Sequence, residues 1–210
     1  MHRIVTQLAE RDPALAEVVA RHGMPPLWPR DPGFDTLIRI VLEQQVTLRS
    51  GEAAYERLVR AARGSDPEAI AALDEPGIRA AGITRQKARY VAGIARDVIA
   101  GDLDLDGLAG LPDDDVRSRL LAVNGIGSWT AEVYLLMALR RPDAWPGGDI
   151  ALATSARDVL GLDARPSAGE LSGIAERWRP WRAVAARLLW HAYLSARAAP
   201  GQDQEDRRWP

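Results

Sequence analysis

Residues 117–149, RSRLLAVNGIGSWTAEVYLLMALRRPDAWPGGD, decide the fold. They predict a helix, a tight turn with glycines at Gly125 and Gly127, a second helix from about Ser128 or Trp129, and a Gly/Pro loop that ends at Asp149. Glycine permits positive φ and lets other parts of the chain approach closely. The N–H groups and the dipole at the start of the second helix favour an anion such as phosphate. The alternative interpretation is an ordinary helical hairpin with a glycine cap.

Asp149 directly precedes the apolar segment IALATSARDVL. Aspartate is a preferred capping residue, so a structural role at the start of a helix is one interpretation. A carboxylate at a helix start, beside glycines that admit a ligand, is also held in its ionised form by the helix dipole. The sequence therefore offers Asp149 either as a cap or as a reactive anion.

The rest of the chain also predicts helices. Asp12 is placed to cap a helix that Gly23 ends, and Thr84 and Gly101 bound another. Residues 34–64 predict one or two more. No segment shows the sustained alternation that is typical of a strand, so we expect an all-α fold of about ten helices.

Composition excludes several classes of protein. The 210 residues contain no cysteine, which excludes disulfides, thiolate zinc sites, a cysteine nucleophile and a cysteine-held iron–sulfur cluster. With neither a signal peptide nor an apolar span, we expect a cytoplasmic protein without membrane contact. The net charge is −2, but residues 65–115 are acidic, whereas residues 116–199 hold 11 arginines against 7 acidic residues. That basic stretch suits a phosphate partner.

The stretch 117–149 resembles the helix-hairpin-helix DNA glycosylases, and in particular DNA-3-methyladenine glycosylase II. Three further segments carry the likeness, namely LIRIVLEQQVT, AAGITRQKARYV and ERWRPWRAVAARLLWHAYL. The resemblance implies two helical lobes with the active site in the cleft between them. Residues 34–141, with the hairpin at about 117–140, would form one lobe, and 1–33 with 142–210 the other. About thirty residues precede the matched region, so we expect the N-terminal β-rich domain of bacterial members to be absent.

The resemblance also implies roles for individual residues. Asp149 matches the catalytic aspartate, which would stabilise the cationic sugar and orient water. Trp129 and Trp190 match aromatic positions of the base pocket, where indole would stack on a cationic base. Val133 stands where the family has a further pocket tyrosine, and Tyr134 is its neighbour. For each tryptophan, core packing is the alternative interpretation.

Other matched positions face DNA. Gln45, after Gln44, would fill the gap that the extruded base leaves, and Leu48 is the next candidate for this wedge. A solvent-facing polar pair is the alternative for the two glutamines. The hairpin would contact a phosphate through Gly125, Gly127 and Thr130. Its carbonyls at Leu121, Val123 and Ile126 match those that hold a sodium or potassium ion.

The resemblance implies a monofunctional hydrolase that excises alkylated purines, chiefly 3-methyladenine and 7-methylguanine, in base excision repair. Trp129 stands where bifunctional relatives carry their Schiff-base lysine, so lyase activity is not expected. We expect a monomer that binds damaged double-stranded DNA and requires no cofactor. Two alternatives stay open, namely the same scaffold acting on deaminated or etheno bases, and a non-catalytic DNA-binding module.

Overall fold

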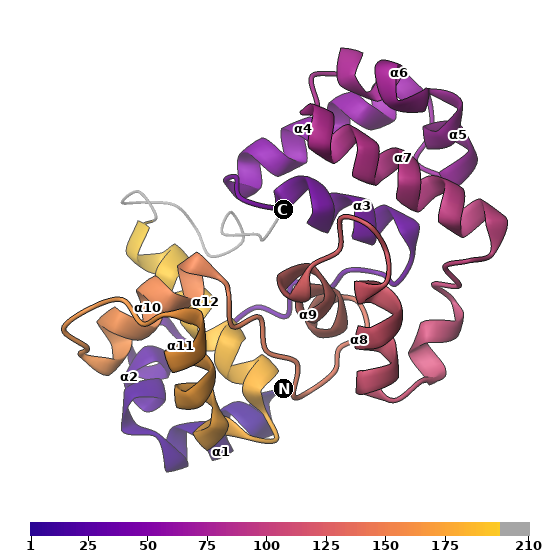
Figure 1. The fold of residues 1–210 in the computed structure, drawn as a ribbon. Helices are drawn as coiled ribbons and strands as arrows, with labels where there is room; N and C mark the ends of the chain where they lie inside the picture. The colour runs from indigo at the N-terminus through magenta and orange to yellow at the C-terminus, as the bar shows by residue number, and fades with distance from the viewer. Residues whose placement is uncertain (198–210) are drawn as a thin grey trace. The chain divides into compact units, whose positions relative to one another are not determined.

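The computed structural model describes residues 1–197, and these residues form helices and loops without a strand (Figure 1). The prediction of an all-α fold is confirmed. The chain divides into two compact units. Among the described residues, unit 1 contains residues 1–29 and 140–197, and unit 2 contains residues 30–139. Within residues 1–197, no helix combines the length and the apolar character that a membrane span requires.

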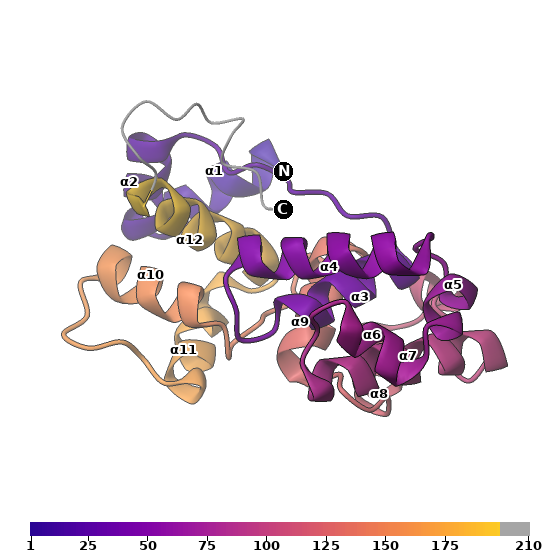
Figure 2. The same ribbon diagram turned by 90° about the horizontal axis from the view of Figure 1, so that it is seen from above.

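Unit 2 consists of seven α-helices and one 3₁₀ helix. They are α3 (Phe34–Glu43), α4 (Leu48–Ala62), α5 (Pro67–Ala72), α6 (Asp74–Ala80), α7 (Arg85–Ala100), η1 (Gly107–Gly110), α8 (Asp113–Leu121) and α9 (Ser128–Met137). Helix α3 is the centre of the unit, because it packs against α4, α7 and α9 (Figures 1 and 2). Its apolar residues are buried almost completely, as Leu37 and Ile40 illustrate.

Unit 1 consists of five α-helices and one 3₁₀ helix. They are α1 (His2–Arg11), α2 (Pro13–His22), α10 (Ile150–Leu160), α11 (Ala168–Ala175), η2 (Glu176–Trp178) and α12 (Arg182–Arg197). Helix α12 is the central helix here and packs against α1, α2 and α10. Its buried face includes Leu188, Leu189 and Trp190. Helices α1 and α2 thus share one hydrophobic core with α10 and α12, although more than a hundred residues of sequence separate the two pairs.

Residues 1–197 form twelve α-helices rather than about ten. The segment 34–62 contains two helices because Thr47 accepts a hydrogen bond from Ser50 N and starts α4 as its cap. The segment 67–80 also divides, at Asp74, whose φ of +55° interrupts regular helical backbone. The caps expected at Asp12 and Thr84 are confirmed, and so are the helix ends at Gly23 and Gly101.

Candidate active site

Asp149 caps helix α10 and is 7% exposed. Its Oδ1 atom accepts a hydrogen bond from Leu152 N at 2.8 Å. The indole Nε1 of Trp190, on α12, lies 3.3 Å from the same oxygen and donates to it. The predicted capping role is therefore confirmed. In addition, unit 1 brings together two of the predicted site residues, the carboxylate and a fully buried indole.

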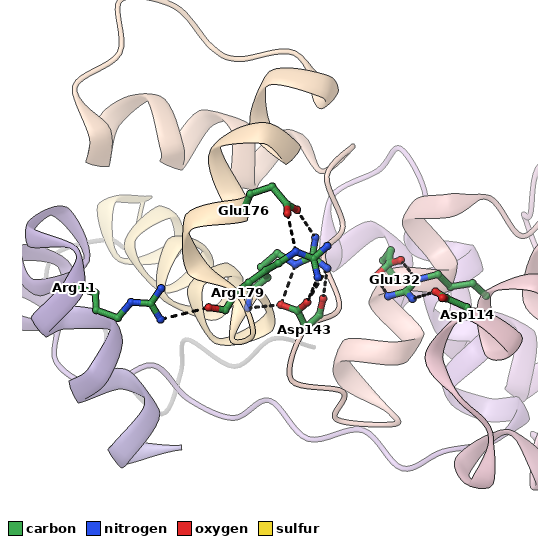
Figure 3. Close-up of polar contacts among 8 residues, drawn as sticks. Arg11, Asp114, Glu132, Asp143, Glu176 and Arg179 are labelled. Carbon is green, nitrogen blue, oxygen red and sulfur yellow. Dashed lines mark hydrogen bonds and ion pairs between the residues drawn. The ribbon is translucent and has the colours of Figure 1, made fainter.

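The loop that leads to Asp149 is fastened to the start of α12. Ala183 N donates to Pro142 O at 3.0 Å, and the Asp143 carboxylate accepts hydrogen bonds from Arg182 and Arg179. Figure 3 shows Arg179 between the carboxylates of Asp143 and Glu176. Because α12 also carries Trp190, the same helix holds both the loop and the indole beside Asp149.

The hairpin in unit 2 is formed by α8, residues 122–127 and α9. Arg117 on α8 donates to Glu132 on α9 at 2.5 Å, and this hydrogen bond raises the pKa of Arg117 (Figure 3). Only one of the two turn glycines has positive φ, since Gly125 has φ of +97° and Gly127 has φ of −95°. Helix α9 begins at Ser128, as predicted, with Gly127 as an N-cap that offers no side-chain acceptor.

Gln44 connects the end of α3 to the hairpin. Its Nε2 atom donates to Gly125 O at 2.9 Å and to Thr130 Oγ1 at 2.8 Å. The structure therefore brings together three of the residues predicted to face DNA. The next residue, Gln45, is exposed and has φ of +57°. Leu48 is the first residue of α4 and is partly exposed.

The predicted pocket residues of unit 2 all lie on α9. Trp129 is in its first turn and is partly exposed, whereas Val133 and Tyr134 are fully buried. The Tyr134 hydroxyl accepts a hydrogen bond from Gly33 N at 2.8 Å, and burial raises the pKa of this phenol. Asp149 and Trp190 belong to unit 1. A pocket that combines these residues, and the cleft that would contain it, stay predictions.

The carbonyls expected to hold a monovalent cation come from the end of α8 and the turn. Leu121 is the last residue of α8, and the carbonyl of Val123 accepts a hydrogen bond from Ile126 N at 3.1 Å. A carbonyl oxygen has two lone pairs, so this bond leaves Val123 able to coordinate an ion as well. A sodium or potassium ion held by these three carbonyls remains a prediction.

Two interactions of unit 2 escaped the sequence analysis. Lys87 Nζ donates to the carbonyls of Leu42 and Gln44, at 2.6 and 2.7 Å. Glu43, between them, forms a buried ion pair with Arg30 at 2.6 Å. Two signals in the sequence could have singled out Lys87, because it is the only lysine among 27 basic residues and it lies in AAGITRQKARYV, a segment that carries the family resemblance. Nothing in the sequence pairs Arg30 with Glu43.

The described residues thus combine a helical fold, a hairpin with a positive-φ glycine, and an aspartate at a helix start after a Gly/Pro loop. The chain belongs to the HhH-GPD superfamily of base excision DNA repair proteins, which matches it over residues 38–180. The family suggested by the sequence motifs is thereby confirmed.

Individual relatives carry related names. The chain is 27% identical over 187 residues to the putative DNA-3-methyladenine glycosylase YfjP of Bacillus subtilis, covering 85% of this chain and 65% of YfjP. It is 36% identical over 166 residues to the probable bifunctional transcriptional activator/DNA repair enzyme AlkA of Mycobacterium tuberculosis, covering 73% of this chain and 32% of AlkA. The chain therefore spans between about a third and about two thirds of these curated relatives.

Solved structures share the fold. The 3-methyladenine DNA glycosylase Mag1 of Schizosaccharomyces pombe, in complex with abasic DNA, matches with a TM-score of 0.81 at 24% identity. The match covers 96% of this chain and 100% of Mag1. Both units thus have counterparts in one solved chain.

Proposed function

We propose that the protein is a monofunctional DNA glycosylase that extrudes alkylated purines, chiefly 3-methyladenine and 7-methylguanine, and hydrolyses their N-glycosidic bond in base excision repair. The observation that carries the proposal is Asp149, a largely buried carboxylate at the start of α10 with the Trp190 indole on Oδ1. Membership of the superfamily and the names of the relatives support it.

Asp149 supplies the negative charge that the reaction needs. When the bond between C1′ and the purine nitrogen breaks, its electron pair leaves with the base, and the sugar approaches an oxocarbenium ion. A carboxylate beside that cation lowers the energy of the transition state, and it can accept a proton as water adds to C1′. An alkylated purine already carries positive charge, so it leaves without a second acid.

The absence of lyase chemistry is part of the proposal. Trp129 occupies the position of the Schiff-base lysine in bifunctional relatives, and indole cannot form an imine with the opened sugar. Lys87, the only lysine, holds two backbone carbonyls in unit 2. We therefore propose that the product is an intact abasic strand, which borohydride does not trap on the enzyme.

The hairpin would hold the DNA strand. The start of α9 offers backbone amides and the positive end of a helix dipole to a phosphate. The carbonyls of Leu121, Val123 and Ile126 would hold a sodium or potassium ion next to it. Phosphate contacts of this kind fix the position of the enzyme without reading sequence.

The test is release of free bases from randomly methylated duplex DNA, with chromatographic identification of each base. Asp149→Asn should abolish release, because it removes the charge, yet asparagine caps a helix as well as aspartate does, so the fold and DNA binding should persist. Asp149→Ala should lose release too and also cost about 1 kcal/mol of stability. Wild-type rates in the Asn variant would contradict the assignment.

Two other outcomes distinguish the remaining functions. Duplexes with a single deaminated or etheno base separate a different lesion preference from alkylpurine excision. DNA binding without release of any base would indicate a binding module instead of an enzyme.

A further inference from the structure

The turn that follows α3 is conformationally costly and weakly held by its own backbone. Gln45 has φ of +57°, and a non-glycine residue in this region costs about 1–2 kcal/mol. The two hydrogen bonds of the turn are long, with Gln44 N to Val41 O at 3.3 Å and Val46 N to Glu43 O at 3.4 Å. Such a turn persists only where its surroundings fix it.

Lys87, on α7, holds this turn in place. Its ammonium donates to the carbonyls of Leu42 and Gln44, which belong to the last turn of α3 and its C-cap. These carbonyls have no partner further along a helix, so a cation there satisfies them. Because one nitrogen binds both oxygens, it fixes the direction in which the chain leaves α3.

Gln44 connects the turn held by Lys87 to the hairpin. Its backbone carbonyl is held by Lys87, and its side-chain amide donates to Gly125 O and Thr130 Oγ1. Lys87, Gln44 and the hairpin therefore form one connected network in unit 2. The side chains directly beyond it, Gln45 and Val46, are exposed, and Val46 keeps 46% of its surface accessible.

We propose that Lys87 is a positioning residue for base extrusion, which holds the Gln44–Gln45 turn rigid so that the Gln45 side chain enters the gap in the DNA stack. This inference rests on the proposed function, because it assumes that the turn faces DNA. Lys87 touches neither the base nor the sugar. It acts by restricting the conformations of the turn in the free protein, so that the turn loses little conformational entropy when DNA binds.

The experiment measures insertion separately from base release. The probe is a duplex with a tetrahydrofuran abasic-site analogue beside a 2-aminopurine, whose fluorescence rises when its stacking is disturbed. At saturating protein, both Lys87→Met and Gln45→Ala should give a smaller rise in 2-aminopurine fluorescence than the wild type. The single-turnover rate of 7-methylguanine release by Lys87→Met should fall about 10- to 100-fold, as expected when the reacting groups are misplaced. Arg89→Met is the control, because it also removes one positive charge from α7 but at an exposed position. This variant should retain the wild-type fluorescence amplitude.

A coupling measurement excludes a merely structural role. In the wild-type background Gln45→Ala should reduce the amplitude, whereas in the Lys87→Met background it should have little further effect, because the turn is already released. If Lys87→Met does not fold by circular dichroism, Gln44→Ala takes its place with the same expectation. A wild-type amplitude in the folded variant, or equal effects of Gln45→Ala in both backgrounds, would overturn the proposal.

The two proposals fail differently. A wild-type protein that inserts into the abasic duplex but releases no base contradicts the hydrolase function and leaves the role of Lys87 intact. A wild-type protein that binds this duplex without any change in fluorescence overturns the insertion role of the turn, and that of Lys87 with it.

Discussion

At the scale of single residues, the two hairpin glycines have different roles. Gly125 has φ of +97°, and a Cβ atom there would lie 2.3 Å from Cγ of Tyr90. Gly125→Ala should therefore destabilise the protein by about 1–3 kcal/mol, through backbone strain and a forced shift of Tyr90. It should also weaken DNA binding, because Gly125 O accepts from Gln44 in the same turn. Urea unfolding followed by tryptophan fluorescence measures the stability, and titration with duplex DNA measures the affinity.

Gly127→Ala is the matched control. Gly127 has φ of −95°, and a Cβ atom there would meet nothing within 4 Å. The only expected cost in stability is that alanine is a poorer N-cap than glycine, about 0.5–1 kcal/mol. Equal destabilisation by the two substitutions would show that the turn does not depend on the conformation of Gly125.

Residues whose roles are local could be predicted from the sequence. The caps at Asp12, Thr84 and Asp149 follow from residue type and position, and all three accept the expected backbone hydrogen bond. Tyr90 against Gly125 and Lys87 against Leu42 could not be predicted in this way. These contacts join residues 35 and 45 positions apart, and only the packing of α7 beside α3 and the hairpin brings them together.

At the scale of elements, the C-terminal end of α3 concentrates buried charge. Glu43 is 4% exposed and pairs with Arg30, while the Lys87 ammonium binds the carbonyls on either side. Burial raises the pKa of Glu43 above 4.5, against the opposing effect of Arg30, and burial lowers the pKa of Lys87. The end of α3 is therefore an element whose stability depends on pH.

The raised pKa of Glu43 fixes the sign of that dependence. Between pH 4.5 and the raised value, the folded state binds more protons than the unfolded state, so the free energy of unfolding falls as pH rises. Glu43→Gln lacks this contribution. We expect the stability of the wild type relative to Glu43→Gln to decline with rising pH from about 4.5. Urea unfolding of both proteins at a series of pH values measures it, and a relative stability that increases with pH would mean that the ion pair with Arg30 dominates instead.

Element boundaries show the limit of sequence reasoning more clearly than element types. The start of α9 at Ser128 and the Gly/Pro loop before α10 follow from glycine and proline positions. The break between α5 and α6 is also marked in the sequence, because Pro76 and Gly77 follow shortly after it, and the Asp74 carboxylate accepts a hydrogen bond from Gly77 N at 2.9 Å. There the chain turns at Asp74, with positive φ, and Ile70 and Ile78 on the two sides are both buried. The proline and glycine thus place the break to within a few residues, whereas the residue at which the chain turns is set by the packing of the two helices.

At the scale of the whole molecule, the two units each contain one part of the proposed chemistry. The hairpin and the Gln44–Gln45 turn belong to unit 2, whereas Asp149 and Trp190 belong to unit 1. Their family motifs could be found in the sequence because each motif is local. A pocket that combines Trp129 and Val133 with Trp190 stays a prediction from the family resemblance, because these residues belong to different units.

The distribution of charge predicts how the molecule responds to salt. The net charge of −2 would repel DNA on average, but residues 116–199 hold 11 arginines against 7 acidic residues. If about four phosphates are neutralised, the logarithm of Kd should rise with the logarithm of salt concentration with a slope of roughly 3.6. Binding should then weaken about 100-fold between about 50 and about 200 mM salt.

Fluorescence anisotropy of a labelled duplex measures this slope. Asp149→Asn should give the same slope, because in the proposed function this carboxylate acts on the sugar and contacts no phosphate. A Kd that does not change with salt would mean that the arginines of this stretch serve internal pairs such as Arg117–Glu132 and Arg182–Asp143 instead of the DNA.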